Sequence, residues 1–363
     1  MQKKYFHSLI LLINIILFLV PSFIIAEENI NNESLVLSNN KNNLIKSISP
    51  IFGYNPTDKF IFGGAYFVTT EKENQPGFYF ETEIMSTSKS DYAIGLTYEK
   101  WRSSPYIYKI STSLSTFAWN YYGEGNNTKV EDVVEINAST SNVVLGIDYK
   151  LYKNVYTGVF FDLRNKEDDS FSGNISKDIY QKETDFGVGL STSYDLRDNA
   201  FSTKNGHFSK LSLVFVPDQF SSDTEIKDFW QTEIDLRYFK TIFMKNVIAG
   251  RFSGGYSGGD PCYLYRYDLG GGAKLRGYYN NRFRGKKFYL TQGEYRLAII
   301  KNISFVLFAE LGDITDSNFK SAKKTYGYGL RFGLPPDYLM KLRFDYGISE
   351  DQSGLFVIFG EVF

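Results

Sequence analysis

The residue types that could carry out chemistry are scarce in this chain. It has two histidines, His7 and His207, and one cysteine, Cys262. A Ser-His-Asp triad needs an imidazole beside its nucleophile, and zinc sites draw on several His and Cys ligands. His207 is expected at a turn between two strands, away from any active-site rim. We therefore expect no enzyme, no catalytic residue, no metal site and no cofactor, and a free loop thiol at Cys262, because a lone cysteine cannot form an internal disulfide.

The chemistry that remains is ion pairing, and it centres on Arg276. This arginine lies in a glycine-rich loop, ahead of a strand that carries Glu294 and a second strand that carries Phe308 and Glu310. Alternation places these three side chains on the inner faces of the two strands. A charge in a partly dehydrated interior needs a partner, and the guanidinium fork suits carboxylates. We expect Arg276 to fold inward onto both acids. The sequence leaves open whether it acts as a conformational lock or only as a plug.

A period of two residues runs from residue 47 to the end of the chain. In residues 340–347 (MKLRFDYG), apolar side chains alternate with charged ones, which indicates a strand with two unlike faces. The expected strands are 47–54, 59–70, 76–86, 90–101, 105–119, 131–152, 154–164, 182–197, 206–216, 229–241, 244–254, 288–299, 303–311, 325–333, 339–347 and 354–363.

The length of these segments distinguishes a membrane barrel from a soluble sandwich. Strands in soluble proteins average about 5 to 6 residues, whereas a tilted strand that crosses a membrane needs about 9 to 11. Aromatic residues recur at the strand ends, where a barrel places its interfacial girdles. Lipid forbids open sheet edges. We therefore predict an all-β fold, a closed transmembrane antiparallel β-barrel of about 16 strands with an inward-folded extracellular loop.

The connections alternate in length, which predicts an orientation. Four long ones, at 165–181, 217–228, 255–287 and 312–324, fall on the side expected to be extracellular, and the other side has short turns. The turn within 194–208 is expected to be periplasmic and mainly structural. Its motif residues are Asp195, Arg197, Asp198 and Gly206, with the charged groups paired within the turn and the glycine left-handed.

The ends of the chain and its charge predict where it acts. Two lysines, an apolar run and a small residue at Ala26 are typical of a secretory signal peptide. We expect a signal peptide at 1–26, a disordered periplasmic leader at 27–46 and the barrel at 47–363. The balance of 40 basic and 41 acidic residues gives no footprint for nucleic acid. The expected location is the bacterial outer membrane.

Three separated stretches carry a family resemblance. KLRGY followed by QGEYRL and FAELGD, the turn YDLRDNAFSTKNGHF, and the terminal LRFDYGIS resemble the barrel domain of the bacterial surface antigen superfamily, which includes BamA and TamA. The resemblance implies a loop motif and its docking partners: Arg276, Gly277 and Tyr278, with Glu294, Phe308 and Glu310. Glu310 stands where the family usually has Asp. The end of the chain resembles an aromatic insertion signal in the last strand, with Phe359 and Phe363.

The resemblance also implies a function. It points to outer-membrane assembly or protein translocation, with outer-membrane lipids as surroundings. The segment before the first expected strand is too short for the family's POTRA domains, so we expect a barrel-only member and a periplasmic partner that supplies client binding. The alternative is a passive pore or a structural surface antigen with no assembly role.

Overall fold

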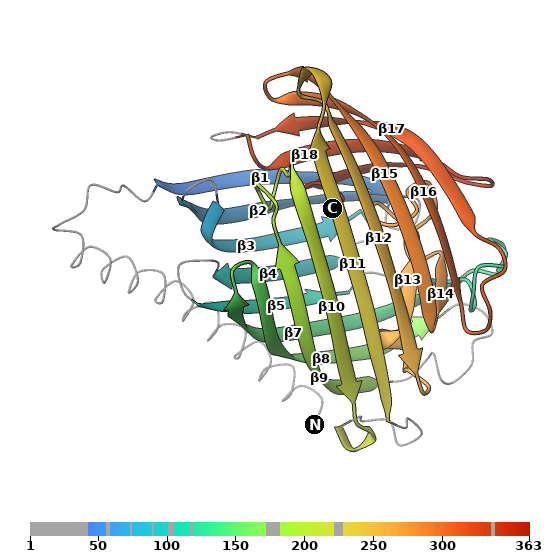
Figure 1. The fold of residues 1–363 in the computed structure, drawn as a ribbon. Helices are drawn as coiled ribbons and strands as arrows, with labels where there is room; N and C mark the ends of the chain where they lie inside the picture. Colours follow the sequence, from blue (N-terminus) through green and yellow to red (C-terminus); the bar gives the residue numbers. More distant parts are fainter. Residues whose placement is uncertain are drawn as a thin grey trace. The chain divides into compact units, whose positions relative to one another are not determined.

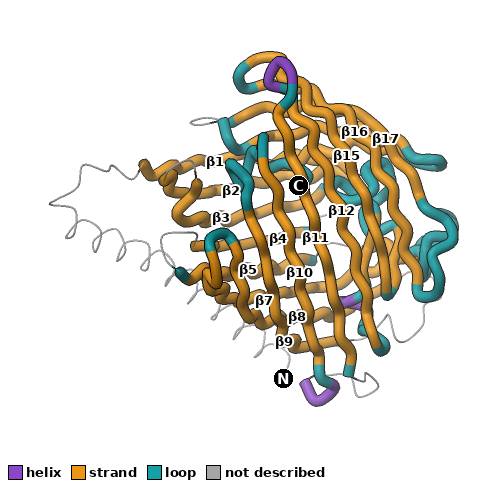
Figure 2. Tube along the Cα trace, viewed as in Figure 1, coloured by secondary structure: helices purple, strands orange, loops and turns teal. Residues whose placement is uncertain are grey.

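Strands make up most of the chain that the structure describes (Figure 2). The computed structural model describes residues 43–55, 59–72, 75–88, 91–100, 105–116, 119–171, 182–220, 228–334 and 338–363. The expected signal peptide, and the leader up to residue 42, lie outside these residues. No helix within the described ranges is long and apolar enough to cross a membrane.

The elements follow one another as strands with short 3-10 turns between some of them. The first half contains β1 (Asn43–Asn55), β2 (Lys59–Lys72), β3 (Gln75–Thr87), β4 (Tyr92–Lys100), β5 (Tyr106–Ser115), β6 (Trp119–Tyr121), β7 (Val134–Tyr152), β8 (Val155–Phe171) and β9 (Glu183–Asp195). The second half contains β10 (Gly206–Val216), η2 (Asp218–Phe220), β11 (Phe229–Thr241), η3 (Phe243–Lys245), β12 (Val247–Gly258), η4 (Tyr263–Tyr265), β13 (Tyr267–Leu269), β14 (Phe283–Gly285), β15 (Lys287–Ile300), β16 (Ile303–Thr315), β17 (Lys323–Gly333), β18 (Lys341–Ile348) and β19 (Ser353–Phe359).

The large sheet is an antiparallel meander in which each strand pairs with the next along the chain. The short β6 and the longer β5 both pair with β7, so they occupy one strand position. The 17 described strands of this sheet therefore fill sixteen positions, which confirms the predicted number. β13 and β14 form a separate small hairpin within the connection between β12 and β15.

The sheet is rolled into a barrel (Figure 1). Contacts between distant strands require this curvature, because the segment after β12 reaches β18 and the chain end after β19 reaches β11 and β12. The outer face is apolar, as a lipid-facing surface requires. On β10, for example, Leu211, Leu213 and Phe215 are 54, 43 and 44% exposed, while Val214 and Val216 on the opposite face are buried.

Several strands are longer than the sequence predicts. β1 begins at Asn43, four residues before the expected start of the first strand at residue 47. β8 continues through polar residues to Phe171, seven positions beyond the predicted end at residue 164. These residues pair with β7, whose backbone groups they satisfy, so the ladder continues although the apolar alternation has stopped.

Candidate functional site

The connection between β12 and β15 folds into the barrel and forms a small core there. Leu269, Leu275, Tyr278 and Phe283 from this connection are buried against the inner wall. The wall residues of this core are Phe288 and Leu290 of β15 and Ile314 of β16. The connection therefore carries its own apolar anchor, and Arg276 lies within this anchored stretch.

Arg276 is fully buried and contacts three carboxylates. Its Nε lies 2.7 Å from Glu310 Oε1, and its Nη1 lies 2.8 Å from Glu294 Oε1 and 3.0 Å from Asp345 Oδ2. The Arg276 backbone N–H also donates to Glu310 Oε2 at 2.6 Å. The guanidinium carbon lies 3.6 Å from the centre of the Phe308 ring, in cation–π geometry. The structure thus brings Arg276 together with all three partners expected from the sequence, and adds Asp345.

Neighbouring strands hold the acids in place. Glu310 on β16 also accepts hydrogen bonds from Gln292 Nε2 at 2.9 Å and from Thr325 Oγ1 at 3.2 Å. Glu294 on β15 accepts from Arg296 Nε at 2.8 Å. Because four strands supply the wall of this site, the acid positions are set by the barrel and not by the loop.

The buried ion network is electrically balanced. Asp345 also forms ion pairs with Arg331 and Arg343. Arg331 Nε pairs in addition with Glu361 at 3.0 Å. Among the described residues the network holds four arginines and four carboxylates: Arg276, Arg296, Arg331 and Arg343, with Glu294, Glu310, Asp345 and Glu361. Burial alone would lower the pKa of Arg276, but Glu310, Glu294 and Asp345 outweigh it and raise that pKa above its ordinary value. The Arg276 guanidinium therefore stays charged.

Two glycines let the loop backbone approach the wall. Gly277 has φ +118°, a conformation that favours glycine. A Cβ on Gly347 of β18 would lie 2.4 Å from the carbonyl carbon of Arg276. Tyr278 packs edge-on against Phe283, with ring centres 4.9 Å apart. Each residue of the Arg-Gly-Tyr motif therefore has its own role. Arg276 makes the ion pairs, Gly277 allows the close backbone approach, and Tyr278 packs in the apolar core.

Sequence reasoning missed Asp345 and Gly347 as parts of this site. Asp345 pairs with Arg343 on its own strand, β18, and with Arg331 on the neighbouring β17. A glycine at the next inward-facing position of the same strand is a signal for close backbone approach. That signal, read together with the neighbouring acid, would have identified β18 as part of the docking wall.

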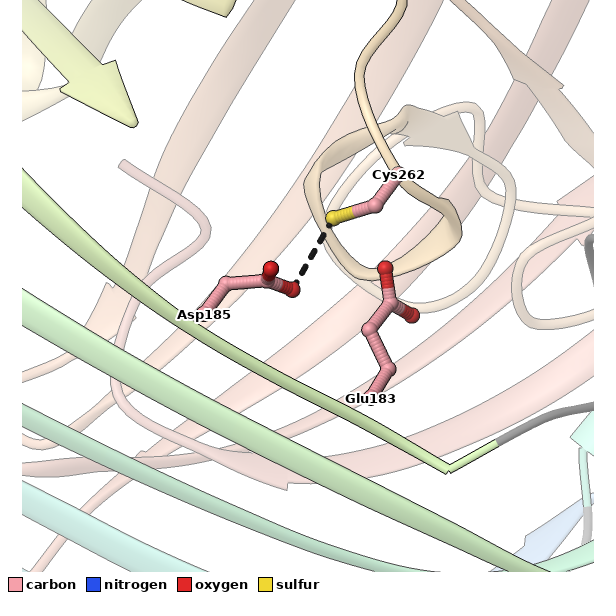
Figure 3. A group of neighbouring side chains, drawn as sticks. All are labelled: Glu183, Asp185 and Cys262. Carbon is pink, nitrogen blue, oxygen red and sulfur yellow. Dashed lines mark hydrogen bonds between the residues drawn. The ribbon is translucent and has the colours of Figure 1, made fainter. Parts of the chain in front are cut away.

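A second ionisable cluster lies between the same loop and β9 (Figure 3). The Cys262 thiol donates to Asp185 Oδ2 at 3.1 Å, and Glu183 lies beside both. The three residues are buried, and one ligand atom from each lies within 4.8 Å of the others, so they could hold a metal ion. The sequence predicted a loop thiol here without its acidic neighbours. Cys262 is free of a disulfide, as expected, but it is buried.

The turn between β9 and β10 is a compact structure of its own. Arg197 donates to both oxygens of Asp195, at 3.0 and 2.9 Å, and stacks on Phe208. The Asp198 carboxylate accepts three backbone N–H groups from within the turn. Gly206 has φ +115°, and a Cβ there would lie 2.1 Å from the Leu196 carbonyl oxygen. The four predicted motif residues thus lie together.

The end of the chain differs from the prediction. β19 ends at Phe359, so the expected strand 354–363 is too long by four residues. Gly360 has φ +84° and turns the chain out of the sheet. Phe363 then lies inside the barrel against Phe239 and Ala249, and does not continue the outer face with Phe359. The expected end of the last strand at residue 363 is therefore wrong, and the role of Phe359 and Phe363 as an insertion signal stays a prediction.

The fold and the buried ion network define an outer-membrane type of β-barrel with an inward-folded arginine loop. Residues 77–355 match the family model described as Omp85 superfamily domain, and the chain belongs to that superfamily. This confirms the resemblance seen in the sequence. No curated protein matches the chain.

Solved structures support the same fold. BamA from Haemophilus ducreyi lacking POTRA domains 1–3 is 12% identical with a TM-score of 0.58, covering 88% of this chain and 70% of that one. CdiB from Acinetobacter baumannii is 12% identical with a TM-score of 0.55, covering 88% and 64%. CdiB from Escherichia coli is 11% identical with a TM-score of 0.57, covering 89% and 68%. Omp85-family barrels such as BamA and CdiB are outer-membrane proteins.

Proposed function

We propose that this protein acts in outer-membrane assembly or protein translocation, with Arg276 as the lock of a movable loop. The observation that carries the proposal is the contact of one loop side chain with three wall acids inside an Omp85-superfamily barrel. An ion-paired loop can exchange between discrete docked and released states.

The remaining parts of the proposal concern location and partners. The chain is exported by its N-terminal segment and resides in the outer membrane, with the long connections outside and the short turns in the periplasm. A periplasmic partner supplies client binding. Membership of a superfamily of transporters and assembly factors supports a role other than catalysis.

The test is quantitative proteomics of the outer membrane after depletion of the protein. We expect the amounts of several other barrel proteins in the outer membrane to fall together. Expression of the wild-type protein should restore these amounts. Arg276→Ala should fail to restore them, while Arg237→Ala, which alters another lumen ion pair, should succeed. The level of each variant in the membrane is measured alongside. If the other barrels hold steady on depletion, the assembly role is wrong.

One observation favours a passive pore as the second candidate. Two lumen cavities of about 380 and 390 Å³ share Lys109, Asp148, Lys210, Ser212 and Glu233, so a polar path runs along the wall built by β5 and β7–β11. Arg276 and its acids do not line it. Under this alternative, depletion leaves other barrels unchanged and the purified protein conducts ions.

A further inference from the structure

One of these cavities lies between the barrel wall and the inward loop. Its volume of about 390 Å³ falls in the range of small-molecule sites. The wall side comes from β5 and from strands β7 to β11, and the loop side includes Tyr265, Tyr267 and Arg284. A molecule bound there would contact both the fixed wall and the movable loop.

The lining of this cavity is positively charged. It contains six basic side chains and four acidic ones, an excess of two positive charges. The basic residues are Lys109, Arg164, Lys210, Arg266, Lys274 and Arg284, and the acidic ones are Asp148, Asp162, Glu233 and Asp268. A low-dielectric wall concentrates the field of such an excess inside the cavity.

Ion pairs within the lining neutralise only part of this charge. Lys109 pairs with Asp148 at 2.6 Å, Arg164 with Asp162 at 2.7 Å and Lys274 with Asp268 at 3.5 Å. Arg266 is paired as well, with acids that do not line the cavity. The charged lining residues outside these ion pairs are Arg284, Lys210 and Glu233. Glu233 lies where this cavity meets the second one.

Among the basic side chains that line this cavity, Arg284 has the strongest unmet demand for an anion. Its residue is 7% exposed, and no carboxylate of a described residue lies within ion-pair distance of its guanidinium. Its Nη1 donates to the Tyr263 carbonyl oxygen at 3.0 Å, the guanidinium stacks on the Tyr263 ring at 4.1 Å, and its Nε has no hydrogen-bond partner. A buried charge without a counter-charge is costly, so a bound anion would stabilise this arrangement.

We propose that this cavity binds a small soluble anion that carries a phosphate or carboxylate group, with Arg284 as the main contact and Lys210 as the second. The guanidinium offers fork geometry for either group, and Lys210 on β10 adds a point charge from the wall. Because Arg284 belongs to the same inward connection as Arg276, a bound anion also ties this connection to the β7–β11 wall.

Calorimetric titration of the folded full chain in detergent tests the proposal. Inorganic phosphate and citrate are the probes, at constant ionic strength with chloride as the reference. We expect both to bind wild type, and Arg284→Gln to weaken binding at least about tenfold, since hydrogen bonds to charged groups are strong. Arg282→Gln is the matched control. Arg282 is buried in the same loop, but it donates a hydrogen bond to Thr128 and does not line the cavity. The affinity of the Arg282→Gln variant for both probes should therefore stay within about twofold of wild type.

A wall variant guards against a folding defect in the loop. Lys210→Met should also weaken binding, and it leaves the loop sequence unchanged. The proposal is overturned if wild type binds neither probe, or if Arg284→Gln and Lys210→Met both bind phosphate as wild type does. Binding seen only with lipopolysaccharide micelles would also overturn it, because the source would then be a lipid phosphate and not a soluble anion.

Discussion

At the scale of single residues, the Arg276 lock combines strong contacts with a large desolvation cost. Removing one partner of a buried ion network leaves the others uncompensated, which costs about 3 to 5 kcal/mol. We expect Arg276→Ala to lower the free energy of unfolding by about this amount, because Glu294, Glu310 and Asp345 lose a shared cation. Urea unfolding followed by fluorescence measures it.

The control for this prediction is Arg237→Ala. Arg237 pairs with Asp235 at 2.6 Å, but its side chain is 22% exposed and Asp235 keeps a second partner in Arg251. Partly solvated pairs of this kind contribute about 1 kcal/mol or less. Equal losses for the two variants would show that Arg276 is no more than an ordinary lumen ion pair.

Cys262 gives a second prediction at this scale. Burial raises the pKa of its thiol well above the ordinary value, and the charges of Glu183 and Asp185 add to the effect. A raised thiol pKa leaves little thiolate at pH 8, so maleimide labelling of the folded protein should be at least about tenfold slower than after unfolding. The rate should rise as the pH approaches the raised pKa.

An exposed cysteine in the same loop calibrates this measurement. Asp260→Cys in a Cys262→Ser background suits the purpose, because the Asp260 side chain is 72% exposed. If Cys262 in the folded wild type reacts as fast as this control, the thiol is not held between the two acids.

At the scale of elements, local alternation predicts what a strand is, and distant contacts decide how the connections fold. The period of two in β18 was enough to place Asp345 inside the barrel. That Asp345 meets Arg276 depends on a loop that starts after β12, four strand positions away in the meander, and no local pattern records this contact.

The end of the chain shows the same limit. Phe359 and Phe363 are four residues apart, a spacing that fits one strand face, and the sequence offers Gly360 as the only local sign of a break. The inward turn is favoured because Phe239 and Ala249 provide an apolar site for Phe363, and Arg296 Nη2 reaches the Phe363 carbonyl oxygen at 3.4 Å. These partners lie on strands that the sequence could not place beside the tail.

At the scale of the whole molecule, folded-in segments lie at both ends of the lumen. At the end with long connections, Arg282 of the inward loop binds Thr128 of the connection between β6 and β7. At the other end, Phe201 of the β9–β10 turn reaches Tyr79 of β3, with ring centres 5.1 Å apart. The two cavities lie between these segments, so the resting barrel holds polar space that both ends restrict.

This arrangement predicts how the barrel conducts. In planar bilayers the wild-type protein should show a small conductance, because ions must pass the loop at one end and the turn at the other. Arg276→Ala releases the loop from the acids of β15, β16 and β18, so openings should become more frequent and severalfold larger. Arg237→Ala removes a charge from a cavity lining but leaves these loop contacts in place, so it should not make openings more frequent. Identical traces for wild type and Arg276→Ala would mean that the loop stays docked through its apolar core around Leu275 and Tyr278, and the ion network would then be a plug and not a lock.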